Sequence, residues 1–131
     1  MVCLDTSVLV ALIRKDQAAM SELRAEAERG GTVSTTTINL CELYAGAYGS
    51  KAPQRELQRV QDLLSHIGIL DLDVGATKRY GELINDDVLK REQIGDFDLI
   101  ISSIDLQQNE KLVTRNLKHF NRVPGLVVEK W

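Results

Sequence analysis

The sequence has few of the features that secreted and membrane proteins share. It contains two cysteines, Cys3 and Cys41, which are too few for the disulfide framework of a small secreted domain and match no zinc-binding spacing. We expect both to be small buried hydrophobic residues. The longest apolar stretch, Val8 to Ile13, is far shorter than the roughly 20 residues that span a bilayer, and no signal peptide precedes it. These absences predict a cytoplasmic protein with no membrane association.

The chain also has little proline and no excess of positive charge. Two prolines and nine glycines among 131 residues leave no room for a long linker, so we expect a single domain over residues 1–131. The net charge is −3, which argues against binding nucleic acid by charge alone. It is compatible with an enzyme that binds RNA through a local basic rim and a metal. Neither Gly-x-x-x-x-Gly-Lys nor Gly-x-Gly-x-x-Gly occurs, which excludes the common nucleotide-binding loops.

The hydrophobic pattern alternates between short strand-like runs and longer helical stretches. Strands are predicted at residues 2–4, 32–37, 67–72, 111–114 and 126–128. Helices are predicted at residues 6–14, 17–29, 39–48, from Pro53 onward, 74–91 and 97–107. Strands separated by helices indicate βαβ units, so the sequence predicts an α/β fold with a mostly parallel sheet and helices on both faces.

Polar residues follow the ends of several predicted strands. Asp5 follows the first strand, Glu42 lies within two turns of the second, and Asp98 begins the helix that leads into the fourth. Thr114 and Asn116 end that fourth strand. In an open α/β sheet, ligands bind at the carboxyl ends of the strands near the point where the strand order reverses. These residues are therefore the candidates for a functional site.

Each of these residues also has a purely structural interpretation. Asp5 could cap the first helix, and Glu42, three residues after Asn39, could complete a capping box. Asp96 is well placed as the N-cap of the helix at 97–107, and we prefer that role for it. Asn beyond a strand is an ordinary turn residue, which is the alternative for position 116.

Convergence of the acids would favour a metal site over separate caps. Carboxylates that share a small volume repel one another unless one is protonated or a cation is bound. Oxygen ligands without sulfur or imidazole suit Mg²⁺ or Mn²⁺, which assist phosphodiester hydrolysis. Two further acids, Asp71 and Asp73, are set aside because their strand is predicted to lie at the sheet edge.

Four motifs in order resemble those of the PIN domain, and the ending Val123 to Trp131 is particularly similar to that of bacterial VapC toxins. The motifs are Leu-Asp-Thr-Ser at 4–7, Leu-Cys-Glu-Leu-Tyr-Ala-Gly at 40–46, Gly-Asp-Phe-Asp-Leu-Ile-Ile at 95–101, and Leu-Val-Thr-Arg-Asn at 112–116 followed by His-Phe at 119–120. The resemblance covers essentially the whole chain. It implies a three-layer α/β/α fold with a five-stranded sheet and an endoribonuclease that uses Mg²⁺ or Mn²⁺.

The resemblance also implies roles for individual residues and for partners. Asp5, Glu42 and Asp98 match the acidic metal ligands, and Thr6 and Thr114 match hydroxyl residues beside the site. The family resemblance further implies an RNA substrate, an antitoxin protein as partner and a homodimer. The antitoxin would bind a partly exposed apolar surface on the helix pair of residues 39–64, which could equally be ordinary core.

Two positions depart from the family pattern. Asn116 stands where many relatives have a fourth acid, which argues against a tightly bound second metal, and Ser7 stands where Asn is common. Asn116 and Thr114 would position phosphate or metal-bound water. Arg115 and Lys118 follow the same strand and are candidate phosphate contacts.

Three other interpretations remain open at this point. A non-catalytic PIN-type scaffold that binds RNA or protein is compatible with Asn116. A metal-independent ribonuclease could use His66 and His119. A phospho-acceptor domain would also place Asp5 after the first strand, but Thr6 and Ser7 occupy positions where such domains need acids.

Overall fold

The computed structural model describes all residues 1–131 and contains a five-stranded sheet in which every pair of neighbouring strands is parallel. The strand order is β3-β2-β1-β4-β5. The strands are β1 (Val2–Leu4), β2 (Val33–Thr36), β3 (Gly68–Leu70), β4 (Lys111–Val113) and β5 (Val128–Glu129). This architecture confirms the predicted three-layer α/β/α fold.

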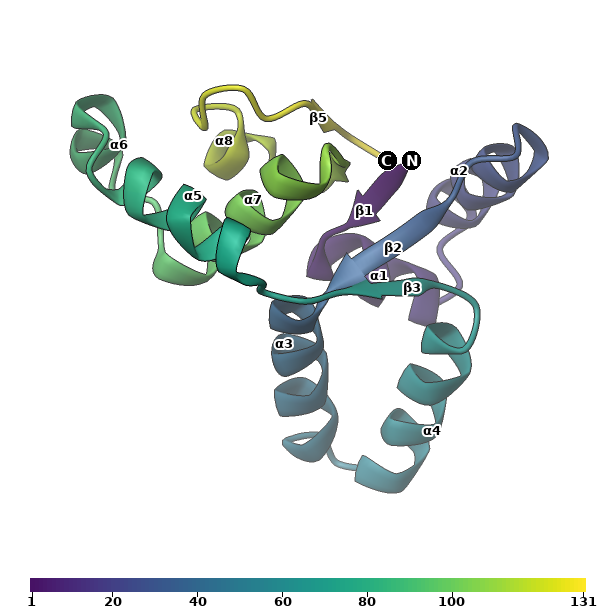
Figure 1. Cartoon of the computed structure of the whole chain (residues 1–131). Coiled ribbons are helices and arrows are strands. Elements are labelled where there is room, and N and C mark those ends of the chain that lie inside the picture. Colours follow the sequence, from purple (N-terminus) through teal and green to yellow (C-terminus); the bar gives the residue numbers. More distant parts are fainter.

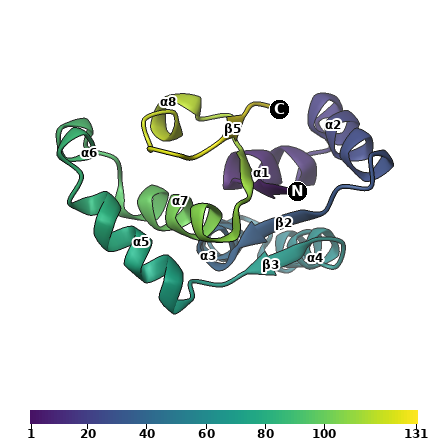
Figure 2. The same cartoon turned by 45° about the horizontal axis from the view of Figure 1, so that its top comes forward.

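Eight helices connect the strands and cover the sheet (Figures 1 and 2). Helices α3 and α4 form a hairpin that projects from the sheet, and α5 packs along α7. The helices are α1 (Thr6–Ile13), α2 (Gln17–Glu28), α3 (Thr37–Tyr48), α4 (Pro53–Leu64), α5 (Val74–Ile84), α6 (Asp87–Glu92), α7 (Asp96–Gln108) and α8 (Leu117–Phe120). None of them is long and apolar enough to cross a lipid bilayer.

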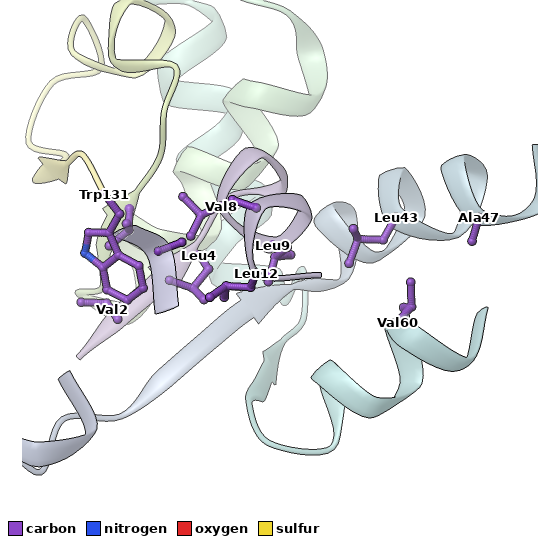
Figure 3. Packing of buried hydrophobic residues seen from close by; sticks show 12 residues of the cluster. Val2, Leu4, Val8, Leu9, Leu12, Leu43, Ala47, Val60 and Trp131 are labelled. Atoms are coloured by element: carbon purple, nitrogen blue, oxygen red, sulfur yellow. The ribbon is translucent and has the colours of Figure 1, made fainter. Parts of the chain in front are cut away.

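The main hydrophobic core lies against the central strand, whose three residues are all buried. Side chains from β1, α1, α3 and α4 interdigitate there, and Trp131 closes one side of the cluster (Figure 3). Leu43, Ala47 and Val60 extend this core between α3 and α4. The inner face of the helix pair is therefore core, whereas Tyr48 on its outer side is 68% exposed.

The order of the strands places the end of β1 at the point where the chain direction across the sheet reverses. β1 lies between β2 and β4, in register at Cys3 with Ser34 and at Leu4 with Val113. The ladder continues one residue further, because the backbone N–H of Asp5 donates to the carbonyl of Val113 at 2.9 Å. Asp5 therefore leaves the sheet from the centre of its carboxyl edge, as predicted.

The structure corrects the element boundaries in two places. The single helix predicted over residues 74–91 is two helices, because the Asp86 carboxylate accepts hydrogen bonds from the backbone N–H groups of Val88 and Leu89 and starts α6 afresh. The short helix α8 was not predicted. The third strand does lie at the sheet edge, and Asp73 after it caps α5 by accepting from the Ala76 N–H.

Two predictions for single residues were wrong, and one open structural alternative, the capping role of Glu42, does not hold. Cys3 is buried as expected, but Cys41 is exposed on the outer face of α3. Asp96 is not an N-cap: Gly95 occupies that position, and Asp96 is the first residue of α7 with no capping hydrogen bond. Asn39 forms its capping box with Thr36, so Glu42 takes no part in capping α3.

Candidate active site

Asp5 is the buried centre of the site, with only 5% of its surface exposed. It occupies the N-cap position of α1, but its side chain makes no capping hydrogen bond. Instead its Oδ1 accepts from Asn39 Nδ2 at 3.1 Å, and its Oδ2 accepts from Thr114 Oγ1 at 2.7 Å and from Ser7 Oγ at 3.3 Å. Donors from α1, α3 and the end of β4 thus fix the orientation of this carboxylate.

Glu42 is tied to the same network through a hydroxyl. Thr6 Oγ1 donates to Glu42 Oε1 at 2.7 Å and accepts from Asn39 Nδ2 at 3.0 Å. Asn39 is fully buried, and its Oδ1 accepts from Thr36 Oγ1 at 2.7 Å. One amide therefore connects the capped start of α3 to the two acids Asp5 and Glu42.

Asp98, in the first turn of α7, is the third acid of the site. Its Oδ2 contacts His119 Nδ1 of α8 at 3.1 Å, and 26% of its side chain remains exposed. The Ser102 hydroxyl donates to the backbone carbonyl of Asp98, one turn earlier in the same helix, and not to the Asp98 carboxylate. The carboxylate is thus accessible at the surface while the backbone around it is held by the helix.

The three acids lie within one another's electrostatic field. Burial raises the pKa of Glu42, and the charges of Asp5 and Asp98 raise it further, while the hydrogen bond from Thr6 lowers it. Burial and the charge of Asp5 also raise the pKa of Asp98, and His119 offsets part of this effect. No Lys or Arg forms an ion pair with any of the three. The site accumulates negative charge that a cation would neutralise.

The donor set fits a hard divalent cation that keeps part of its water shell. The available ligands are carboxylate oxygens, with hydroxyl groups beside them and no thiolate, which suits Mg²⁺ or Mn²⁺. The side chains do not form a preassembled cage, since no three His, Cys, Asp or Glu groups converge that closely. Mg²⁺ is commonly held by one or two carboxylates together with several waters, so an open arrangement suits it.

The other predicted site residues differ in how close they lie to this centre. Thr114 is buried and contacts Asp5, and the backbone N–H of Asn116 donates to Thr114 Oγ1 at 3.0 Å, with Asn116 itself exposed at the rim. Arg115 points away, because its Nη2 binds Asp16 Oδ2 at 2.6 Å and its Nε donates to the Trp131 carbonyl. Lys118 is exposed and lines a hollow together with Asp98.

Sequence reasoning missed the contribution of two polar residues, the buried Asn39 and the partly buried Ser7. Asn39 was considered only as a capping partner, and Ser7 only as a departure from the family pattern. Ser7 accepts from the Arg115 backbone N–H at 3.0 Å and so ties α1 to the end of β4. His66 precedes β3, whereas His119 lies beside Asp98 at the carboxyl edge, so the two histidines lie at opposite ends of the sheet. They form no catalytic pair.

Comparison with known proteins assigns the chain to a family. The PIN domain model matches residues 2–126. The chain is 33% identical to Ribonuclease VapC2 of Rickettsia felis, over 98% of this chain and 96% of the relative, and 30% identical to the tRNA(fMet)-specific endonuclease VapC of Shigella flexneri over the same shares. Among solved structures, VapBC2 from Rickettsia felis bound to a promoter DNA fragment matches with a TM-score of 0.93 and 32% identity, covering 100% of this chain and 99% of that one. The chain belongs to the PIN-domain family and, within it, to the VapC ribonucleases.

Proposed function

We propose that this protein is a Mg²⁺-dependent endoribonuclease that acts as the toxin of a toxin–antitoxin pair. The observation that carries the proposal is that Asp5, Glu42 and Asp98, from three separate elements, lie near one another at the carboxyl edge of the sheet with no Lys or Arg paired to any of them. Acids that served only as helix caps would have no reason to meet there. Mn²⁺ has similar ligand preferences and is expected to substitute for Mg²⁺.

The three carboxylates would hold the metal, each supported by a neighbouring group. Asp5 is held by Asn39 and Thr114, Glu42 by Thr6, and Asp98 by His119. A bound Mg²⁺ would supply Lewis acidity and would lower the pKa of a coordinated water. Glu42 is suited to accept a proton from the attacking water, because burial and its acidic neighbours raise its pKa above the ordinary value of a glutamate.

The remaining predicted residues have two roles: Asn116 would contact the substrate, and Thr6 and Thr114 would orient the acids. Asn116 lies exposed beside Thr114 at the rim, where its amide can donate to a phosphate oxygen. Thr114 and Thr6 keep the acids oriented rather than contacting RNA directly. In-line attack by water would leave a 5′-phosphate and a 3′-hydroxyl.

The proposed partners are an antitoxin protein and a second copy of the chain. Three of the solved relatives with high structural similarity are VapBC structures, which supports an antitoxin partner. The VapBC complex from Salmonella typhimurium, for example, matches with a TM-score of 0.90 and 29% identity. Light scattering of the isolated protein would test the homodimer.

The first experiment measures cleavage of labelled RNA by the antitoxin-free protein, in Mg²⁺ and in EDTA. The RNA panel includes tRNA(fMet), because that specificity is named for the Shigella flexneri relative. We expect cleavage that requires the metal and yields 5′-phosphate ends. Cleavage that persists in EDTA with cyclic phosphate products would contradict the metal mechanism. Mg²⁺ binding without cleavage of any RNA would favour the non-catalytic scaffold.

A further inference from the structure

Two hollows each contain part of the acidic centre in their lining. The first has a volume of about 340 Å³, lies between α1, α3 and α4, and includes Thr6 and Glu42 in its lining. The second has a volume of about 490 Å³, lies between the α6–α7 connection and α8, and includes Asp98 and His119. Each hollow therefore contains one acid, Glu42 or Asp98, and the buried Asp5 lies close enough to both for its charge to add to the effect of burial in raising their pKa values.

The two hollows carry matching sets of basic side chains. Each holds one arginine that is already paired: Arg59 with Glu56 at 3.2 Å in the first, and Arg122 with Glu92 at 2.5 Å in the second. Each also holds one exposed cation that forms no ion pair. These are Arg14 in the first hollow and Lys118 in the second.

The unpaired cations Arg14 and Lys118 would reduce the electrostatic repulsion between the acidic site and a polyanion. A polyanion that approaches three carboxylates in a chain of net charge −3 is repelled unless positive charge lies along its path. Arg115, the other basic residue near the end of β4, is occupied by Asp16 and by the Trp131 carbonyl. Arg14 and Lys118 are therefore the cations without an ion pair in the two hollows, one in the hollow of Glu42 and the other in the hollow of Asp98.

We propose that the two hollows form one continuous RNA track, in which Arg14 contacts a backbone phosphate on one side of the scissile bond and Lys118 contacts one on the other. This inference rests on the proposed nuclease function and adds to it a two-sided binding mode. The acidic centre then acts in the middle of a bound strand rather than at its end. This arrangement accounts for endonucleolytic cleavage by a small acidic protein.

The test measures binding of a labelled single-stranded RNA at several salt concentrations, with every variant built on the inactive Asp5→Asn background. The variants are Arg14→Gln, Lys118→Gln and both together, with Lys78→Gln as the matched control because Lys78 is exposed on α5 and lines neither hollow. Each site variant should weaken binding and lower the slope of log K against log salt by about 0.7, the value for one single-strand phosphate contact. The double variant should lose about twice that slope, and the control should change neither quantity.

Cleavage by the same variants with Asp5 intact separates this proposal from the proposed function. We expect KM to rise several-fold in Arg14→Gln and Lys118→Gln with kcat within about twofold of the wild type. Wild-type cleavage together with an unchanged salt slope in either variant would overturn the two-sided track and leave the nuclease intact. An effect of Lys118 alone would assign the first hollow to another ligand, such as a protein partner. Failure of the wild type to cleave would remove the nuclease function itself.

Discussion

Two buried aspartates, Asp5 and Asp105, lie in contrasting surroundings within the same fold. Asp5 is 5% exposed and accepts hydrogen bonds on both carboxylate oxygens from Asn39, Thr114 and Ser7. Asp105 on α7 has no exposed surface, and neither of its oxygens accepts a hydrogen bond from an N–H or O–H group. The carboxylate of Asp5 is therefore held by hydrogen bonds, whereas that of Asp105 is buried without them.

Burial without an N–H or O–H donor raises the pKa of Asp105. Desolvation raises its pKa from 3.8 to about 8, with a further contribution from the charge of Glu110, while the nearby Cys3 thiol, a weak donor, offsets only part of this effect. Asp105 is therefore protonated in the folded protein at neutral pH. The comparison teaches that the donors around Asp5 are specific to the site and are not a general response of this fold to a buried acid.

The largest expected effect is the loss of activity in Asp98→Asn. The substitution keeps the shape of the side chain but removes a charge from the predicted metal site. Activity should fall by at least about a hundredfold, more than the roughly 10- to 100-fold typical of losing an outer-shell partner. Thermal unfolding should show a retained or slightly more stable fold, because a half-buried charge next to Asp5 is removed. Near-normal cleavage by this variant would contradict the assignment.

The next effect tests the donor network directly. Asn39→Ala removes the amide that donates to Asp5 and to Thr6, the residue that holds Glu42. Both Asp5 and Glu42 should therefore lose part of their orientation. We expect kcat/KM to fall roughly 10- to 100-fold, with the activity shifted to higher Mg²⁺ concentration. Asn85→Ala is the control, since Asn85 is an exposed amide that bonds only to the Gly81 carbonyl of its own helix. An Mg²⁺ dependence equal to that of the wild type would show that Asn39 has only a structural role.

Asp105→Ala should change stability rather than activity. Protonation of an acid whose pKa is raised on folding favours the folded state. This contribution to the free energy of unfolding is fully present below the unfolded pKa of 3.8 and is lost as the pH rises through the folded pKa of about 8. The free energy of unfolding of the variant, relative to that of the wild type, should therefore increase by up to about 1.4 kcal/mol per pH unit across that window and then level off. Urea unfolding at pH 5, 7 and 9 measures it. A difference that does not vary with pH would mean that Asp105 is not protonated in the fold.

The smallest effect is expected at Asp96, two residues from Asp98. Asp96 is exposed, makes no hydrogen bond and does not cap α7. Asp96→Asn should leave cleavage within about twofold and the free energy of unfolding within about 0.5 kcal/mol of the wild type, as is usual for surface substitutions. A large loss of cleavage would instead show that Asp96, like Asp98, belongs to the site.

The fold and the central acids could be predicted from the sequence because they depend on local patterns. Short apolar runs between amphipathic helices indicate a parallel sheet, and residues that follow its strands meet at one edge. The position of Asp5 after the first strand made it a candidate, although a role as helix cap remained open until the structure showed that its side chain makes no capping hydrogen bond. Family resemblance then added the likeness of Glu42 and Asp98 to known metal ligands.

The features that could not be predicted depend on contacts between distant segments. Arg115 lies 99 residues from Asp16, and only the folded chain shows that this ion pair turns its guanidinium away from the site. The role of Asn39 required knowing that its amide faces Asp5 across 34 residues of sequence. The break before α6 had a local signal in Asp86, but the continuous apolar pattern concealed it.

The most direct test of the account compares Asp5→Asn with Asp105→Asn in one measurement, the rate of RNA cleavage as a function of Mg²⁺ concentration. Both substitutions remove one carboxyl group from a buried aspartate of the same fold. We predict that Asp5→Asn abolishes cleavage at every Mg²⁺ concentration, whereas Asp105→Asn follows the wild-type curve. Equal effects of the two substitutions, or wild-type cleavage by Asp5→Asn, would contradict a metal-dependent centre built around Asp5.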